Sequence, residues 1–268
     1  MVIAFSTAAL FPRPTLTALE LIQACGFPFA ELMPQCRHET RPSFAIMFAR
    51  KKFRVEIWSV HFPLVFSPIF YNPYNTMQQE AAILIKDIVR MSAALGAKII
   101  VIHPPNDMPE DLKRLFERPI IQNIRRLCDN AAEHGIAIAI ENSPSSQCKS
   151  PTGMLKFLST LEHENAYPML DTTEAVEAGY DPVDFLQTID PIHLHVSDHS
   201  ATAQHLPVGE GLIEWEKFFR VLRAKHYSKG LVVEPAYRYF LSYKKEKEII
   251  QKIQKMKYFI INIWEKIL

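Results

Sequence analysis

Several features of extracellular and membrane proteins are missing from this sequence. Its 268 residues include four cysteines, and no two of them form a C-x-x-C pair. That spacing excludes a disulfide framework and a cysteine zinc site, and it predicts reduced thiols in a cytoplasmic protein. The longest stretch without Asp, Glu, Lys or Arg, residues 57–79, is interrupted by three prolines, so no membrane span is expected. The apolar residues 1–11 follow no basic segment and are better explained as a first strand than as a signal peptide.

The sequence also lacks an excess of charge of either sign. Thirty Lys and Arg residues oppose 29 Asp and Glu residues, which leaves a net charge of +1. Such a chain has no overall positive electrostatic field to attract a polyanion, so its net charge does not support nucleic-acid binding. A local basic patch that binds nucleic acid is left as an alternative. The hydrophobic fraction of 48% excludes intrinsic disorder. A homo-oligomer is compatible with this composition.

Short apolar runs alternate with longer amphipathic stretches along the whole chain. The runs lack polar alternation, which is typical of strands that are buried on both faces. Glycine is scarce, with eight residues, and four of these fall between a predicted helix and the next strand. The predicted strands are 2–5, 29–32, 55–60, 98–102, 137–140, 167–170, 192–196 and 231–233. The predicted helices are 15–25, 43–52, 77–95, 120–134, 152–161, 182–188, 214–225 and 244–267.

Eight strand–helix units without a linker predict a single α/β domain over residues 1–268, folded as a (β/α)₈ TIM barrel. The alternative is an open, doubly wound sheet. That fold normally carries a glycine-rich phosphate turn after an early strand, and this sequence has none.

Polar residues stand at the carboxyl ends of the predicted strands, where a TIM barrel carries its chemistry. These residues are Ser6 or Thr7, Glu31, His61, His103, Glu141, Asp171, His195 and Glu234. A single histidine at a strand end is more often a structural hydrogen-bonding group than a ligand. A whole rim of ionisable groups is costly unless something compensates their charge, and a divalent metal would do so. The mixed oxygen and nitrogen ligands suit zinc or manganese.

Three neighbouring features leave alternatives open. His193 shares a strand face with His195 and either supports the site or packs in the core. Asp198 and His199 follow that strand directly and are predicted to orient the ligand. The aromatic loop 62–74 either folds down as a hydrophobic lid, which is favoured, or stacks on a sugar or a base.

Five motifs together resemble the xylose-isomerase-like TIM barrel superfamily (AP endonuclease family 2). They are Glu141-Asn142, the segment 170–175, the segment 193–198, His205 before the segment 207–211, and Val233-Glu234. That superfamily contains sugar phosphate isomerases and epimerases as well as endonuclease IV. The resemblance to the sugar enzymes implies one divalent ion held by Glu141, Asp171, His195 and Glu234. The resemblance to endonuclease IV implies a further metal site at His61, His103 and Glu141.

The sequence departs from endonuclease IV at the third metal site of that enzyme. Glu174 stands in place of a histidine, and Ala203 stands in place of an aspartate, so only His205 remains. This departure argues against a three-metal phosphodiesterase.

The favoured hypothesis is therefore a metal-dependent isomerase or epimerase that acts on a sugar or a related small polyhydroxy carbonyl compound. The resemblance implies that Glu141 and Glu234 exchange a proton with the substrate from opposite sides. Glu174, His205 and Glu31 are expected to contact the substrate. The alternative is an endonuclease IV-like zinc phosphodiesterase for abasic DNA. An inert barrel that only binds a partner is least favoured, because the four metal ligands are intact.

Overall fold

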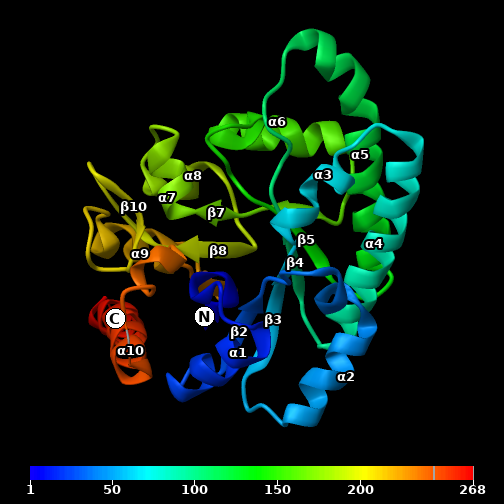
Figure 1. The fold of residues 1–268 in the computed structure, drawn as a ribbon. Helices are drawn as coiled ribbons and strands as arrows, with labels where there is room; N and C mark the ends of the chain where they lie inside the picture. The colour runs from blue at the N-terminus through cyan, green and yellow to red at the C-terminus, as the bar shows by residue number, and fades with distance from the viewer. Residues whose placement is uncertain (244, 268) are drawn as a thin grey trace.

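Short buried strands form the centre of the computed structural model, which describes residues 1–243 and 245–267. All of them are parallel, and helices surround them (Figure 1). The barrel strands are β1 (Val2–Ser6), β2 (Phe29–Leu32), β3 (Glu56–His61), β4 (Ile99–Ile102), β5 (Ala137–Ile140), β6 (Ala166–Pro168), β7 (Leu170–Asp171), β8 (His193–Val196) and β11 (Gly230–Val233). Every residue of β4, β8 and β11 is buried, which explains why their sequences show no polar alternation.

The sixth predicted strand, 167–170, is divided in the structure into β6 and β7. The sheet order is β6-β5-β4-β3-β2-β1-β11-β8-β7, so the two ends of the sheet meet at this divided strand. Met169 separates the two halves, and its amide still donates to the carbonyl of Ile140 on β5. The segment 166–171 thus occupies one strand position, pairing first with β5 and then with β8. The predicted single-domain TIM barrel is confirmed, with this one interruption.

The helices lie on the outside of the barrel. The ten-residue helix α2 and the long helices α4 and α5 lie side by side on one flank, and α9 and α10 lie on the opposite flank (Figure 1). The helices are α1 (Thr15–Ala24), α2 (Pro42–Lys51), α3 (Ser67–Phe70), α4 (Asn75–Ala94), α5 (Glu110–Ala132), α6 (Pro151–Leu161), α7 (Thr172–Glu177), α8 (Pro182–Thr188), α9 (Trp215–Ala224) and α10 (Glu246–Lys266). Short 3-10 helices are η1 (Thr7–Leu10), η2 (Arg37–Thr40), η3 (Leu64–Phe66), η4 (Gln147–Lys149) and η5 (Tyr237–Tyr239).

The fourth predicted helix, 120–134, corresponds to α5 and was predicted to begin too late. Helix α5 begins at Glu110, ten residues before the predicted start at 120, and it contains Pro119. A proline inside a helix removes one hydrogen bond and usually ends the helix, so the sequence suggested a start beyond it. The first turn carries Glu110 and Asp111, whose negative charges suit a helix N-terminus. The added segment is largely exposed and charged. Its apolar residues Leu112, Leu115 and Phe116 do have helical spacing, but Pro119 interrupts the pattern before Ile120.

A β-hairpin that the sequence did not predict follows β8. Strands β9 (Asp198–Ser200) and β10 (Ala203–Leu206) pair in antiparallel fashion beside the barrel mouth. Asp198 holds this region together, because its carboxylate accepts hydrogen bonds from the amides of Gly209 and Ile213 and from the indole of Trp215. Asp198 is fully buried and does not line the mouth pocket; its carboxylate is engaged by the loop itself.

The cysteines and the helices of the structure agree with two expectations from the sequence: unpaired thiols and the lack of a membrane-spanning helix. All four cysteines are unpaired, and three of them are buried. Among the described residues, no helix combines the length and the apolar character needed to cross a membrane.

Candidate metal centre

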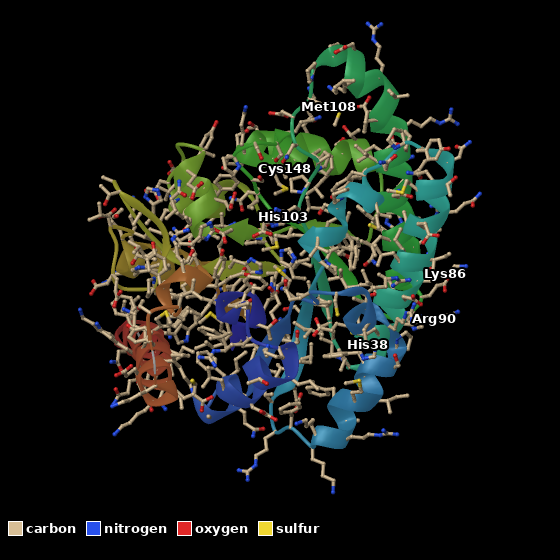
Figure 2. The ribbon with its side chains drawn as sticks, viewed as in Figure 1. His38, Lys86, Arg90, His103, Met108 and Cys148 are labelled. Atoms are coloured by element: carbon tan, nitrogen blue, oxygen red, sulfur yellow. The ribbon has the colours of Figure 1, made fainter. Side chains whose placement is uncertain are left out.

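The barrel brings most of the predicted site residues together at its mouth. One pocket of about 380 Å³ lies at the carboxyl ends of the strands. Seven of the predicted residues line it: His61, His103, Glu141, Asp171, Glu174, His205 and Glu234. His103, labelled in Figure 2, lies well inside the ring of outer helices, whereas Lys86 and Arg90 of α4 lie at the edge of the molecule.

The first candidate ligand group surrounds the Nδ1 atom of His195. This nitrogen lies 2.7 Å from Oε2 of Glu234, 2.9 Å from Oε1 of Glu141 and 3.9 Å from Oδ2 of Asp171. His195 comes from β8, Asp171 ends β7, and Glu141 and Glu234 directly follow β5 and β11. Ligand atoms of Glu141, Asp171 and His195 all lie within 4.8 Å of one another. The four residues that the resemblance assigned to one ion therefore converge.

The second candidate ligand group shares Glu141 with the first. Oε2 of Glu141 lies 2.9 Å from Nε2 of His103 and 3.3 Å from Nε2 of His61. The three ligand atoms again lie within 4.8 Å of one another. The ring of His61 is fixed by its Nδ1 atom, which is 2.8 Å from the carbonyl oxygen of Phe62. The two imidazoles could thus present nitrogens to a cation that also binds Glu141.

Other contacts hold the carboxylates in place. Oδ1 of Asp171 caps helix α7, accepting hydrogen bonds from the amides of Thr173 and Glu174 at 2.7 and 2.9 Å. Its Oδ2 atom is left to face His195. The hydroxyl of Ser6, at the end of β1, donates to Oε1 of Glu234 at 3.0 Å. Ser6 was noted at a strand end but was not assigned to the site.

The electrostatics of the mouth are those of a crowded, buried acidic cluster. Burial raises the pKa of Asp171 to about 7; His205 opposes that rise, and the charge of Glu141 adds to it. Burial also opposes ionisation of Glu141, but His103 and His195 outweigh it and hold its pKa well below the usual range. In turn, burial lowers the pKa of His103, and Glu141 outweighs burial and raises it. A divalent cation bound among these carboxylates would replace the protons on the imidazoles, so the donor set fits such an ion.

Glu31 occupies a different place from the one the sequence suggested. It was expected to contact substrate, but its side chain is fully buried and does not line the pocket. Oε1 of Glu31 lies 3.0 Å from Nε2 of His195, and Oε2 lies 2.9 Å from Nε2 of His193. The hydroxyl of Ser59 donates to the same Oε2 at 2.7 Å. His193 and Ser59 thus belong to a buried group beneath the mouth; only His193 was considered from the sequence, as one of two alternatives.

The remaining wall of the pocket is mostly apolar, with Gln35 as a polar exception. Leu64 and Val65 of the aromatic loop line it, as do Phe11 and Tyr237, whose ring centroids lie 5.2 Å apart. Phe62 and Phe70 are buried against each other with centroids 4.6 Å apart, which agrees with the hydrophobic-lid interpretation of loop 62–74. His205 enters from the hairpin, with Nε2 3.4 Å from Oε1 of Glu174.

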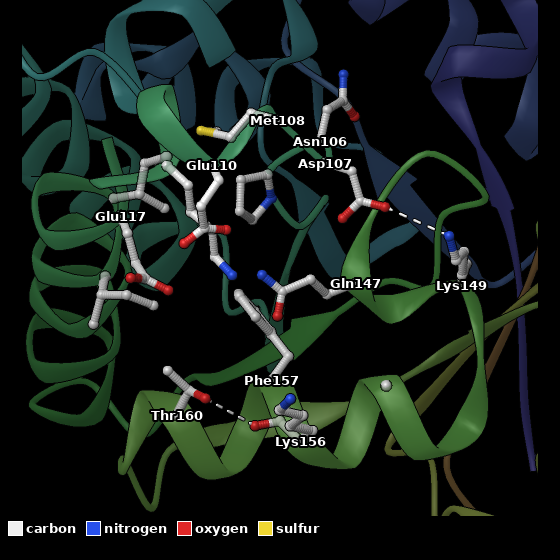
Figure 3. Close-up of a pocket in the computed structure, with 15 residues that line it drawn as sticks. Asn106, Asp107, Met108, Glu110, Glu117, Gln147, Lys149, Lys156, Phe157 and Thr160 are labelled. Carbon is white, nitrogen blue, oxygen red and sulfur yellow. Dashed lines mark hydrogen bonds and ion pairs between the residues drawn. The ribbon is translucent and has the colours of Figure 1, made fainter. Parts of the chain in front are cut away.

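A second pocket lies outside the mouth, between helices α5 and α6 (Figure 3). Its volume is about 420 Å³, and its walls include Met108, Glu117 and Phe157. Nζ of Lys149 lies 3.6 Å from Oδ2 of Asp107 at its edge, and both side chains are about half exposed. None of the predicted site residues lines this pocket.

Comparison with known proteins agrees with this arrangement. The family model described as xylose isomerase-like TIM barrel matches residues 19–259. The chain belongs to this family. The resemblance stated from the motifs is thereby confirmed.

Three solved structures are similar to nearly the whole chain. A D-tagatose 3-epimerase-like protein is 21% identical with a TM-score of 0.80, covering 100% of this chain and 98% of its own. The IOLI protein with a bound zinc atom is 18% identical with a TM-score of 0.75, covering 100% and 99%. A D-psicose 3-epimerase in the presence of D-fructose is 15% identical with a TM-score of 0.79, covering 98% and 99%. At these identities the likeness establishes the fold.

Proposed function

We propose that this chain is a divalent-metal-dependent isomerase or epimerase that moves a proton on a sugar or a related polyhydroxy carbonyl compound. The observation that carries this proposal is the pair formed by Glu141 and Glu234. Both carboxylates line one pocket, and both lie within 3 Å of the same nitrogen, Nδ1 of His195. They follow strands β5 and β11, which are not neighbours in the barrel. A substrate between them would therefore meet one carboxylate from each side.

Glu141, Asp171, His195 and Glu234 would hold the ion, and zinc or manganese suits this donor set. When bound, the ion supplies positive charge to two neighbouring substrate oxygens and lowers the pKa of the carbon acid between them. One of Glu141 and Glu234 then removes the proton and the other returns it. Glu174 and His205 lie on the same wall of the pocket and would bind substrate hydroxyls. The solved epimerase and the zinc-containing protein support a ketose substrate and a bound metal.

Deuterium exchange tests the proposal without knowledge of the natural substrate. The zinc- or manganese-loaded protein is incubated in D₂O with D-tagatose, D-psicose and D-fructose, and NMR follows the hydrogens beside the carbonyl. We expect deuterium to enter at one such carbon of at least one ketose. Absence of exchange from every ketose, in protein with its metal bound, would count against the proposed chemistry.

Substitution of Glu234 by Gln identifies the proton-transferring group. Gln keeps one oxygen ligand but cannot accept the proton, so exchange should fall by about 10²–10⁴-fold. Metal affinity should weaken only in part. Glu216→Gln, on the exposed surface of α9, is the matched control and should keep wild-type exchange. If Glu234→Gln exchanges deuterium at nearly the wild-type rate, Glu234 is not the acid or base.

One observation supports a second candidate, an endonuclease IV-like zinc phosphodiesterase. His61, His103 and Glu141 form a complete second ligand group. The net charge of +1 opposes it, because duplex binding requires positive charge toward the backbone. Ala203 also opposes it, because it stands in place of an aspartate ligand of the third metal site. We therefore expect no incision of a labelled duplex with an abasic site when zinc or manganese is supplied. Incision that is lost in both His61→Ala and His103→Ala would favour the nuclease instead.

A further inference from the structure

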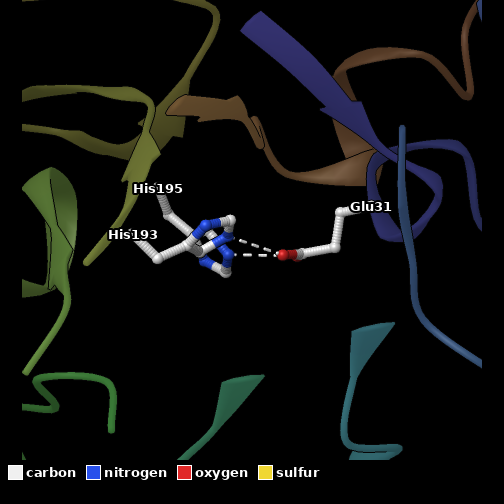
Figure 4. A group of neighbouring side chains, drawn as sticks. All are labelled: Glu31, His193 and His195. Carbon is white, nitrogen blue, oxygen red and sulfur yellow. Dashed lines mark hydrogen bonds and ion pairs between the residues drawn. The ribbon is translucent and has the colours of Figure 1, made fainter. Parts of the chain in front are cut away.

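A buried carboxylate lies behind the candidate metal ligand His195, on the side away from the pocket. Glu31 belongs to β2 and His195 to β8, and β1 and β11 separate these strands in the sheet. The contact therefore crosses the barrel interior. In Figure 4 the imidazoles of His193 and His195 both point toward the single carboxylate of Glu31.

Three potential donors converge on this carboxylate. Nε2 of His195 lies 3.0 Å from Oε1, Nε2 of His193 lies 2.9 Å from Oε2, and the hydroxyl of Ser59 donates to Oε2 at 2.7 Å. All four side chains are fully buried. Neither Oε1 of Glu31 nor Nε2 of His195 makes a well-aligned hydrogen bond to any described residue, although the two atoms lie 3.0 Å apart. A carboxylate taken out of water needs donors, and the donor that faces Oε1 is His195.

The two ring nitrogens of His195 face different partners: Nδ1 faces the candidate metal ligands and Nε2 faces Glu31. Nδ1 faces Glu141, Asp171 and Glu234, so this nitrogen must be free of a proton to bind an ion there. The neutral ring then carries its proton on Nε2, and the acceptor nearest to that nitrogen is Oε1 of Glu31 at 3.0 Å. A carboxylate behind a ligating histidine fixes both the tautomer and the orientation of the ring, and it makes the ring a stronger donor to the metal.

We propose that Glu31 is a positioning residue that holds His195 as an Nδ1 ligand, and that His193 and Ser59 in turn hold Glu31. This inference rests on the proposed metal site, but it is independent of the substrate. It also explains why Glu31 is an acid although it does not reach the pocket.

Zinc affinity provides the test, with a chromophoric chelator as competitor and full-length protein throughout. Glu31→Gln should weaken zinc binding by about 10–100-fold without changing the number of ions bound. Glu31→Asp, which keeps the charge on a shorter side chain, should recover part of the loss. Asp198→Asn is the matched control, since Asp198 is an equally buried acid that contacts the hairpin and not His195. It should change stability but leave zinc affinity within about threefold of wild type.

A spectroscopic measurement separates positioning from general loss of structure. In the zinc-loaded protein, nitrogen-15 NMR should place the proton of His195 on Nε2, with a strongly downfield proton resonance. In Glu31→Gln that resonance should move upfield, because a neutral amide is a weaker acceptor than a carboxylate. A proton found on Nδ1, or a resonance unchanged by Glu31→Gln, would overturn the proposal.

The affinity results distinguish the remaining outcomes. Zinc affinity within about threefold of wild type in Glu31→Gln, or a loss equal to that in Asp198→Asn, would overturn the positioning role. Loss of one whole equivalent of zinc, with the rest bound as before, would make Glu31 a ligand itself and would equally overturn it. A wild-type protein that binds no zinc or manganese would remove the metal site, and both proposals would fail together.

Discussion

The mouth pocket and the outer pocket between α5 and α6 have similar volumes but differ in how their polar groups are held. Their cavities measure about 380 and 420 Å³. Both use the segment that follows β4, since His103 lines the first and Pro105 to Met108 line the second. In the mouth, most of the polar atoms come from the ends of separate barrel strands, joined by Glu174 of α7 and His205 of the hairpin. In the outer pocket, they come from the exposed faces of two helices and the loops before them.

This difference affects what each pocket can do. In the mouth, Asp171 and Glu234 are each fixed by a further hydrogen bond, from the α7 amides and from Ser6. Their remaining oxygens, Oδ2 of Asp171 and Oε2 of Glu234, both face Nδ1 of His195. Burial raises the pKa of Asp171. In the outer pocket, the carboxylate of Asp107 pairs with the half-exposed Lys149 at 3.6 Å, and no further ion pair of Asp107 is found among the described residues. Cavity size therefore says little about function here; convergence of fixed, buried groups says more.

The largest expected effect comes from Asp171→Ala. This change removes a candidate ligand and the N-cap of α7, so zinc affinity should fall by more than about 100-fold, beyond the range typical of groups that only orient a ligand. Loss of the cap should also cost about 1 kcal/mol of stability. Asp171→Asn keeps a capping oxygen, so it should lose zinc affinity while retaining most of the stability. Zinc titration and urea unfolding measure the two effects. Near-wild-type zinc affinity in Asp171→Ala would contradict the assigned ligand set.

The sequence predicted the rim well because the barrel imposes its geometry. His103, Glu141 and Glu234 each follow the last residue of a buried strand, and such positions must meet at the mouth. Glu31 was assigned by the same rule, but Leu32 follows it within β2, so Glu31 stands one position before the strand end. His195 is likewise followed by Val196 within β8. Relative to the strand end, Glu31 and His195 therefore stand two positions before His103, Glu141 and Glu234. This shift keeps the side chain on the same face of the strand but deeper in the barrel, which separates the buried pair from the pocket residues.

Features that depend on contacts distant in sequence could not be predicted. The hairpin of β9 and β10 is held by Asp198 through groups 11 to 17 residues later, and no local pattern reveals these partners. The interruption at Met169 did carry a local signal, because Pro168 lies inside the predicted strand 167–170 and a proline cannot donate a hydrogen bond to a neighbouring strand. The start of α5 was missed because Pro119 normally marks a boundary.

A smaller, pH-dependent effect is expected from His205, which lies in the mouth beside Glu174. Burial alone would lower the pKa of His205, but Glu174 and Asp171 raise it to about 9, above the ordinary value of about 6.5. Protonated His205 therefore stabilises the metal-free protein fully below about pH 6.5, and this stabilisation is lost as the pH rises through about 9. The loss should be on the order of 1–3 kcal/mol.

Urea unfolding in the presence of a chelator, at several pH values between 6 and 9.5, measures this dependence. Glu174→Gln should flatten the fall in stability across that range. Glu162→Gln is the control, because Glu162 pairs with Arg125, which keeps its charge throughout. An equally steep fall in wild type and Glu174→Gln would assign the effect to another group.

The smallest expected effect comes from Asp107→Ala in the outer pocket, the same substitution as Asp171→Ala in the mouth. Asp107 forms an exposed ion pair with Lys149, and such pairs contribute about 0–1 kcal/mol to stability. The melting temperature should therefore change by less than about 4 °C. Zinc affinity should stay within about twofold of wild type, since Asp107 is not a mouth residue and its side chain contacts none of them among the described ion pairs. Calorimetry and zinc titration of the two Asp→Ala variants, side by side, make the comparison direct. A tenfold or larger loss of zinc affinity in Asp107→Ala would show that the segment after β4 couples the two pockets through His103, and the contrast between them would no longer hold.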